Sequence, residues 1–205
     1  MDPNATVHVV DDHELARNSV CALVESMGVA ATVYASAEEF LESYHPGRPG
    51  CLVTDVRMLG MSGIELQERL AASKIDLPVV VITAHANTPL TVRAMRNGAV
   101  TLLEKPCNDN DLWDAIREAL DQDERQRAAA HRRRQIRDRL DSLTQQEREV
   151  LDRMVAGKLN KVIARELDVS IRTIENRRHN IFRKFGAESV AELVRLVMES
   201  EADPD

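Results

Sequence analysis

The sequence predicts an α/β domain built on a five-stranded parallel sheet, followed by a small all-α domain of four helices. Short β-branched apolar segments recur along residues 1–120, and stretches with the apolar spacing of a helix separate them. Strands that alternate with helices form a parallel sheet covered on both faces. After residue 120 only helical spacing continues, which indicates an all-α second domain.

The expected strands are short runs rich in Val, Ile and Thr, residue types that favour extended structure. They are Val7–Val10, Ala31–Tyr34, Cys51–Thr54, Val79–Ile82 and Thr101–Glu104. Parallel strands end at the same edge of their sheet, and ligands of such sheets bind at that edge. Polar residues that follow these strands are therefore expected to meet in one site.

The segment between the domains, residues 121–141, reads DQDERQRAAAHRRRQIRDRLD and contains neither Gly nor Pro. Most of its residues are strong helix formers, so we expect a long charged helical linker. Three roles remain open for this helix. It is a solvated spacer, a partly dimerising helix that uses Ile136, Leu140 and Leu143, or a basic helix that touches DNA phosphates.

Residues 142–205 are expected to form the second domain, and each of its short helices has a recognisable start. The expected caps are Thr144 with Glu147, then Asn160, then Ser170, and finally Ser189 with Glu192. The third helix is expected to run to about Phe185, and the fourth from Val190 to Met198.

Composition and charge exclude several classes of protein. With 43% hydrophobic and 30% charged residues, the chain can build cores and is not a disordered tail. Residues 1–120 carry 9 Lys+Arg against 17 Asp+Glu, which argues against general nucleic-acid affinity there. No stretch approaches the roughly 18 apolar residues of a membrane helix, and the N-terminus lacks the pattern of a secretory signal. Three cysteines without metal-ligand spacing predict reduced thiols in a cytoplasmic protein. The lack of a long apolar stretch predicts no membrane association.

Polar residues stand where the expected strands end. Asp11 and Asp12 follow the first strand, Asp55 the third, Thr83 the fourth and Lys105 the fifth. Carboxylates that converge repel one another unless a cation neutralises them, and a few hard oxygen ligands open to water suit Mg²⁺. A carboxylate nucleophile with a divalent cation, a hydroxyl and an ammonium is a site for phosphoryl transfer to an aspartate.

The motifs VVDD, TDVRMLGMSG, VVVITAH and LLEKP, in this order, resemble the receiver domain of two-component response regulators over residues 6–120. The resemblance implies a flavodoxin-like doubly wound fold with Asp55 as the phosphoacceptor. It also implies a Mg²⁺ site at Asp55, with Asp12 and the backbone carbonyl of Arg57 as direct ligands and Asp11 acting through water. Thr83 and Lys105 would then contact phosphoryl oxygens, and Lys105–Pro106 would be a cis peptide.

Three positions depart from the pattern of receiver domains. Leu59 stands where proline is usual, Leu102 where a mobile switch aromatic is usual, and Cys107 where Phe is common. None of these is a catalytic group. A leucine at 102 offers less contact area than an aromatic ring, so the gap between inactive and active states is expected to be smaller or carried elsewhere.

The stretch NKVIARELDVSIRTIENRRHNIFRKF predicts a helix, a turn and a basic helix, the arrangement of a helix-turn-helix. Residues 143–186 are similar to the LuxR-type helix-turn-helix, so the chain is identified as a member of the NarL/FixJ class of response regulators. The resemblance implies DNA contacts from the basic helix and its neighbour. The candidate phosphate contacts are Lys161, Arg172, Thr173, Arg178 and Lys184. The candidates facing the bases are Glu175, Asn176 and His179, with Arg183 on the same outer side.

We therefore expect a response regulator that a sensor histidine kinase phosphorylates on Asp55, and that then dimerises and binds promoter DNA to regulate transcription. RNA polymerase is a further candidate partner, and the only catalysis expected is the receiver's own phosphoryl transfer and dephosphorylation. One alternative is a phosphorylation-independent DNA-binding regulator whose receiver is a dimerisation module. A second is a small-molecule phosphatase, although Arg57 stands where its second carboxylate is needed.

Overall fold

The computed structural model describes residues 2–201 and divides into two compact units, Met1–Arg127 and Ala128–Asp205. The ends of the predicted domains, residue 1 and residues 202–205, lie outside the described residues. The predicted linker, residues 121–141, is helical and belongs to one helix, α5 (Asp109–Asp141). Because the boundary between the units falls after Arg127, each unit holds part of this helix.

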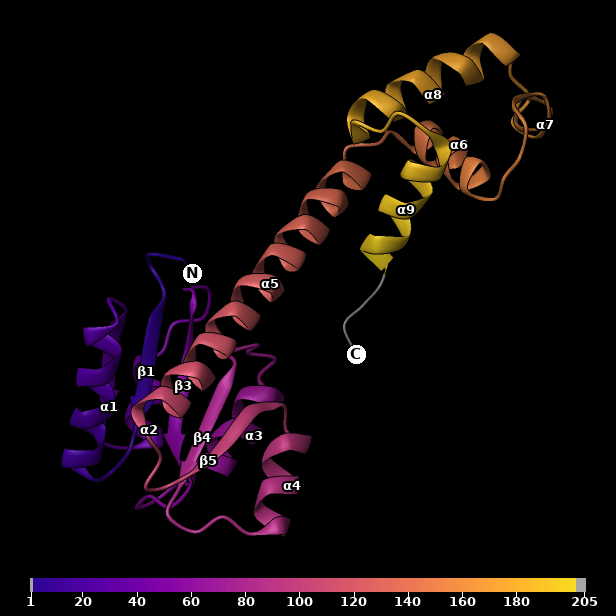
Figure 1. The fold of residues 1–205 in the computed structure, drawn as a ribbon. Helices are drawn as coiled ribbons and strands as arrows, with labels where there is room; N and C mark the ends of the chain where they lie inside the picture. The colour runs from indigo at the N-terminus through magenta and orange to yellow at the C-terminus, as the bar shows by residue number, and fades with distance from the viewer. Residues whose placement is uncertain (1, 202–205) are drawn as a thin grey trace. The chain divides into compact units, whose positions relative to one another are not determined.

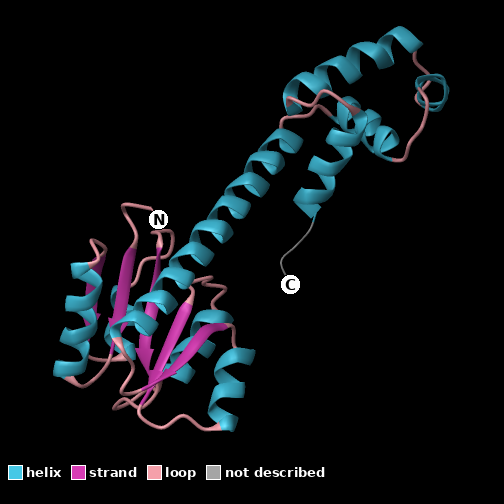
Figure 2. Cartoon of the chain, viewed as in Figure 1, coloured by secondary structure: helices cyan, strands magenta, loops and turns pink. Residues whose placement is uncertain are grey.

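The first unit is built on a five-stranded parallel sheet in the order β2-β1-β3-β4-β5 (Figure 1, Figure 2). The strands are β1 (Thr6–Val10), β2 (Ala30–Tyr34), β3 (Gly50–Asp55), β4 (Val79–Thr83) and β5 (Ala99–Glu104). The predicted parallel sheet is confirmed, and each predicted strand overlaps an observed one. Residues of the central strands β3 and β4 are almost all buried, as expected for a parallel sheet covered on both faces.

Helices cover both faces of this sheet. They are α1 (Glu14–Ser26), α2 (Ala37–Ser43), α3 (Gly63–Ala72), α4 (Thr88–Arg96) and α5. On one face α2, α3 and α4 pack through Phe40, Leu66 and Ala94. On the other face α1 and α5 pack through Val24 and Ile116. Neighbouring strand residues alternate between the two cores, because successive side chains of a strand point to opposite faces.

A cluster of rings lies on the α2 side of β1. The ring of His8 lies 5.6 Å from that of Phe40 and 5.3 Å from that of Tyr44, centre to centre. His8 Nδ1 also lies 3.2 Å from the hydroxyl oxygen of Tyr34. Burial among these rings disfavours the charged imidazolium and lowers the pKa of His8 to about 4.

The start of the predicted linker is bonded to the first unit. Asp123 is 2% exposed, and its Oδ2 accepts hydrogen bonds from the amide of Gly50 at 3.0 Å and from Arg127 Nε at 2.7 Å. Arg127 also donates to the carbonyls of Gly47 and Arg48. Residues 121–127 therefore continue the body of this unit, which the sequence did not predict.

The second unit contains α6 (Gln145–Val155), α7 (Asn160–Glu166), α8 (Ile171–Phe185) and α9 (Val190–Glu201), together with the end of α5 (Figure 2). The predicted four helices are confirmed. Ile136 and Leu140 of α5 are buried in the same core as Ile174 and Phe185. Within this chain they are not an exposed seam, so the structure does not favour the partly dimerising role for this helix.

Two of the predicted helix caps differ from the structure. The Thr144 capping box is confirmed in both bonds, and Ser170 caps α8. The prediction for Asn160 was wrong, because Asn160 is already helical and Leu159 is the N-cap, with no side-chain bond. At α9 only half of the expected box is present. The hydroxyl of Ser189 accepts from the amide of Glu192, but the Glu192 carboxylate accepts from the amide of Glu188, one residue before Ser189.

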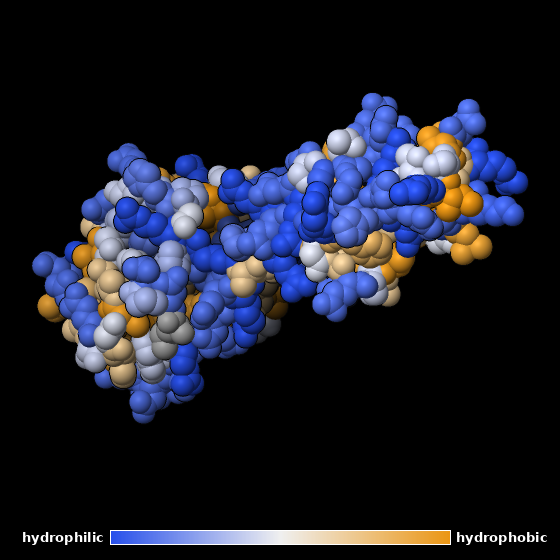
Figure 3. All heavy atoms as spheres, turned by 90° about the horizontal axis from the view of Figure 1, so that it is seen from above, coloured by the Kyte–Doolittle hydropathy of each residue, from blue (hydrophilic) through white to orange (hydrophobic). Residues whose placement is uncertain are grey.

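The face of the described chain that Figure 3 shows is mostly polar. Hydrophilic side chains cover most of the visible face of each unit (Figure 3). Among residues 2–201, no helix combines the length and the apolar character of a membrane span.

The buried ring of His8 predicts a pH-dependent loss of stability. The unfolded state takes up a proton near pH 6.5, whereas the folded state, with its pKa of about 4, resists it. Stability is therefore full above pH 6.5 and falls as the pH is lowered, by roughly 2 to 3 kcal/mol at pH 4. Urea unfolding of wild type and His8→Gln over this range should show the extra loss in wild type only. Parallel loss in the two proteins would contradict the assignment.

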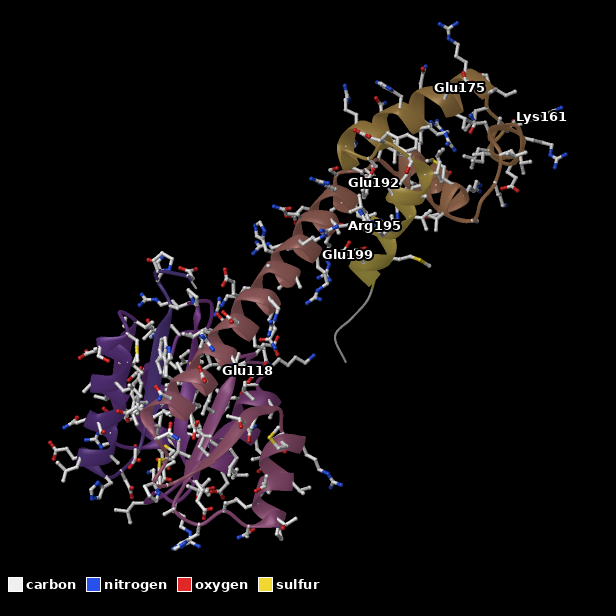
Figure 4. All side chains as sticks on the ribbon, in the orientation of Figure 1. Glu118, Lys161, Glu175, Glu192, Arg195 and Glu199 are labelled. Atoms are coloured by element: carbon white, nitrogen blue, oxygen red, sulfur yellow. The ribbon has the colours of Figure 1, made fainter. Side chains whose placement is uncertain are left out.

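The buried carboxylate of Asp123 is expected to stabilise the first unit. Its partner Gly50 is at the start of β3, away from the carboxyl edge where Asp11, Asp12 and Asp55 lie. In Asp123→Ala the amide of Gly50 and the guanidinium of Arg127 lose a buried acceptor. We expect the free energy of unfolding of the first unit to fall by roughly 2 to 4 kcal/mol. Glu118→Ala is the control, since Glu118 is exposed on the same helix (Figure 4). Equal midpoints of urea unfolding for the two variants would sink this prediction.

Candidate functional site

Three carboxylates meet at the carboxyl edge of the sheet in the first unit. Asp11 and Asp12 follow β1, and Asp55 is the last residue of β3. One carboxylate oxygen of each lies within 4.8 Å of the others. Asp11 is buried and Asp55 partly buried, so water screens their repulsion poorly. The structure thus brings together the acidic residues that the strand ends predict.

Lys105 places an ammonium among these carboxylates. Its Nζ donates to Asp11 Oδ2 at 2.7 Å and lies 3.4 Å from Asp55 Oδ1. Its backbone amide donates to the carbonyl of Thr83 at 2.7 Å, which ties the end of β5 to that of β4. The predicted cis peptide between Lys105 and Pro106 is present.

The charges in this pocket do not balance. Burial raises the pKa of Asp55, with Lys105 opposing the rise and Asp11 adding to it. For Lys105, burial acts to lower the pKa, but the hydrogen bond to Asp11 and the nearby carboxylates outweigh it, so the net pKa is raised. The ammonium is therefore charged at neutral pH. Within residues 2–201, the buried Oδ1 of Asp55 accepts no hydrogen bond of good geometry, and the ammonium of Lys105 lies 3.4 Å from it.

Thr83 and the loop after it complete the rim of the pocket. Thr83 is fully buried, and its Oγ1 accepts from the amide of His85 at 3.3 Å. The carboxylate of Glu104 accepts from the amide of Ala86 at 3.1 Å and so anchors the same loop. Glu104 is not among the predicted site residues, although an acidic residue at a strand end beside Lys105 was an available signal.

The loop between β3 and α3, residues 56–62, carries Arg57, whose side chain is exposed. The amide of Leu59 donates to Asp12 Oδ2 at 2.9 Å. At the end of the loop, a Cβ on Gly63 would lie 2.1 Å from the carbonyl oxygen of Asp55, so only glycine allows α3 to begin this close to the strand. The Leu59 bond was missed because backbone donors leave no side-chain pattern.

The pocket has the donor set that Mg²⁺ prefers. Asp11, Asp12 and Asp55 offer oxygen ligands on one side of a partly open site. One ammonium offsets only part of their charge, and the buried oxygen of Asp55 lacks a donor. A hard divalent cation fits both observations.

Leu102, where an aromatic switch residue is usual, is partly buried and packs against the core on the α2, α3 and α4 side of the sheet. It therefore contributes to that core, as the apolar strand pattern predicts.

The second unit presents a helix-turn-helix. In the turn between α7 and α8, Asp168 adopts a left-handed backbone with φ of 52°, and Ser170 caps α8. Ile174, Ile181 and Phe185 face the core. The exposed predicted contacts are Lys161 on α7 (Figure 4), and Arg172, Glu175, Asn176, His179 and Arg183 on α8. The helical period places the α8 members on the side opposite the core.

Other predicted DNA contacts have partners within the unit. Lys184 Nζ donates to Glu147 Oε2 at 2.7 Å, and Glu147 is 6% exposed. Burial acts to raise the pKa of Glu147, but the hydrogen bonds from Lys184 and Thr144, together with the charge of Lys184, outweigh it and the pKa is lowered. Thr173 shares a hydrogen bond with the capping Ser170. The guanidinium of Arg178 lies 5.8 Å from the centre of the ring of Phe182, one helical turn further along α8. These residues support α8 from within.

Two protein families match the chain. The family described as response regulator receiver domain matches residues 7–117, and bacterial regulatory proteins, luxR family, matches residues 141–197. The transcriptional regulatory protein FixJ of Azorhizobium caulinodans is 41% identical over 97% of this chain and 94% of its own length. That of Bradyrhizobium diazoefficiens is 40% identical over 97% of each chain.

Solved structures give the same result. A low-resolution structure of the response regulator StyR is 42% identical, with a TM-score of 0.87 over 96% of this chain and 99% of that one. Full-length FixJ from B. japonicum is 39% identical, with a TM-score of 0.57 over 97% of this chain and 98% of that one.

We expect substitutions of the neighbouring residues Lys184 and Arg183 on α8 to have different effects, one on stability and the other on DNA binding. Lys184→Met leaves Glu147 without its cation and should lower the free energy of unfolding of the second unit by roughly 1 to 3 kcal/mol. Arg183→Met should leave stability unchanged, since its side chain is exposed. It should instead reduce the salt dependence of binding to a mixed-sequence duplex, log K against log salt, by about one phosphate contact. The reverse assignment of the two effects would contradict the structure.

Proposed function

Since the chain belongs to the response regulators that join a receiver domain to a LuxR-type DNA-binding domain, we propose that a sensor histidine kinase phosphorylates it on Asp55. The phosphorylated chain dimerises and binds promoter DNA to regulate transcription. The observation that carries this proposal is the carboxylate of Asp55, which ends β3 with an unbonded, buried Oδ1 beside Lys105.

In the proposed transfer, a carboxylate oxygen of Asp55 attacks the phosphorus of the kinase's phosphohistidine. The new O–P bond forms as the N–P bond breaks, and its electron pair remains on the imidazole. Lys105, 3.4 Å from Asp55 Oδ1, is placed to neutralise charge on the phosphoryl oxygens. The hydroxyl of Thr83, at the end of the neighbouring strand, donates to one of these oxygens once it turns from the amide of His85.

Asp11, Asp12, Asp55 and the carbonyl of Arg57 would hold Mg²⁺ in this pocket. When bound, the ion supplies charge neutralisation to the phosphoryl group. Catalysis is limited to the chain's own phosphorylation and dephosphorylation. In the second of these, water attacks the phosphorus, the O–P bond to Asp55 breaks, and inorganic phosphate leaves.

Helix α9 is the proposed dimer surface of the second unit. Leu193 and Leu196 are buried in the core, but Val190 is 36% and Met198 62% exposed, so the helix carries apolar side chains beyond those that close the core. Glu192, Arg195 and Glu199 lie on the same helix (Figure 4). A dimer would present two recognition helices to paired half-sites.

The exposed residues of the helix-turn-helix are the proposed DNA contacts. Lys161, Arg172 and Arg183 contact phosphates. Asn176 and His179 face the bases, and Glu175 accepts from a cytosine amino group. Thr173, Arg178 and Lys184 have intramolecular partners, so we propose that they position α8 rather than bind phosphates. RNA polymerase is the proposed partner of the DNA-bound form.

Phosphorylation of Asp55 predicts a change in solution mass. With Mg²⁺ present, sedimentation of the full chain should shift from monomer to dimer on addition of beryllofluoride, which mimics a phosphoryl group on the aspartate. Asp55→Asn should show no shift, because it lacks the carboxylate oxygen. If wild type binds beryllofluoride and stays monomeric, Asp55 is not the switch for dimerisation. A variant Asp55→Asn that regulates its promoter normally would favour a phosphorylation-independent regulator.

A further inference from the structure

The backbone of the β3–α3 loop is bonded to the carboxylate cluster at Leu59. Its amide donates to Asp12 Oδ2 at 2.9 Å. The side chain of Leu59 is 82% exposed, so the structural role of this residue lies in its backbone. Proline, which is usual at this position in receiver domains, has no N–H and could not make this bond.

The carboxylate of Asp12 has fewer hydrogen-bond donors than that of its neighbour Asp11. Asp11 Oδ1 accepts from the amide of His13 at 2.8 Å, and Asp11 Oδ2 accepts from Lys105 at 2.7 Å. Asp12 is exposed, and within residues 2–201 the amide of Leu59 is the only hydrogen-bond donor to its carboxylate. The bond occupies Oδ2 and leaves Oδ1 available to a cation.

The same loop is held from its other side by α2. The amide of Met61 donates to Glu38 Oε1 at 3.0 Å, and Ser62 with Glu65 forms the capping box that begins α3. The Leu59 bond is thus the point at which the loop, with Arg57 two residues earlier, is joined to the β1–α1 connection. Asp12 accepts this bond, and Arg57, whose carbonyl is another of the proposed ligands, stands two residues before Leu59 in the same loop.

We propose that the amide of Leu59 is a positioning group of the Mg²⁺ site: it orients the carboxylate of Asp12 and holds the loop that carries the Arg57 carbonyl. The inference rests on the proposed function, because it concerns the same Mg²⁺ site. Groups that orient metal ligands commonly change metal affinity by about 10- to 100-fold when removed.

Two substitutions at this position separate the backbone from the side chain. Leu59→Ala removes the exposed side chain and keeps the N–H. Leu59→Pro removes the N–H. The next residue, Gly60, has φ of 81°, the conformation of the third residue of a type II turn, in which the second residue is commonly proline. The proline variant is therefore expected to fold, with circular dichroism as the check.

The experiment measures Mg²⁺ affinity of the full chain by isothermal titration calorimetry. We expect Leu59→Ala to stay within about twofold of wild type, and Leu59→Pro to bind about tenfold more weakly. Should the proline variant fail to fold, an amide-to-ester substitution at Leu59 removes the same donor and keeps the side chain. It carries the same expectation.

Three outcomes would overturn the inference. Equal affinity of wild type and Leu59→Pro would mean that the amide does not position the ligand. Tighter binding by Leu59→Pro would mean that the amide competes with the cation for Asp12. Weakening by Leu59→Ala to the same extent would assign the effect to the side chain. In each of these the proposed function stands, provided that wild type binds Mg²⁺. If wild type itself shows no binding, the proposed Mg²⁺ site fails and the inference fails with it.

Discussion

The ammonium of Lys105 between Asp11 and Asp55 is the interaction around which the first unit is arranged. Parallel strands end at one edge of the sheet, and this brings carboxylates after β1 and β3 close enough to repel one another. The cation comes from the end of β5 and reaches across the edge of β4. One ammonium cannot balance three carboxylates, so the pocket retains an attraction for a further cation. A hard divalent cation matches that need, and such a cation would in turn attract the oxygens of a phosphoryl group.

Some charged residues of the second unit pair with buried groups and others remain exposed, even where they are neighbours in the sequence. Lys184 and Arg183 are adjacent in the sequence, yet one pairs with the buried Glu147 and the other is exposed. A buried carboxylate without a partner is costly, so its lysine is committed to the fold. The basic residues left over, such as Arg172, lie on the outer side of α8. The proposed recognition surface is what remains after the bundle has satisfied its own buried charges.

Helix α5 shows how a linker in the sequence becomes part of two folded units. Asp123 and Arg127 bond it to the start of β3. Ile136 and Leu140 are core residues of the second unit. The charged residues between these positions read as a solvated helix, but both ends carry contacts as specific as those of any other helix in the chain. The boundary between the units falls after Arg127. Before it the helix is bonded to the first unit, and after it the helix packs in the core of the second.

By itself the sequence determined the element types, the parallel sheet, the four later helices and the convergence of Asp11, Asp12, Asp55, Thr83 and Lys105. The element types follow from periodicity and helix-capping chemistry, which act over short distances along the chain. The convergence follows from one general rule, that parallel strands end at the same edge of their sheet. The tertiary structure alone decided that Lys184 serves Glu147, that Asp123 binds Gly50, and that the Leu59 amide holds Asp12. Each of these joins residues far apart in the sequence, and two of them use a backbone donor. A hydrogen bond over such a distance depends on how elements pack, so no local pattern of side chains can announce it.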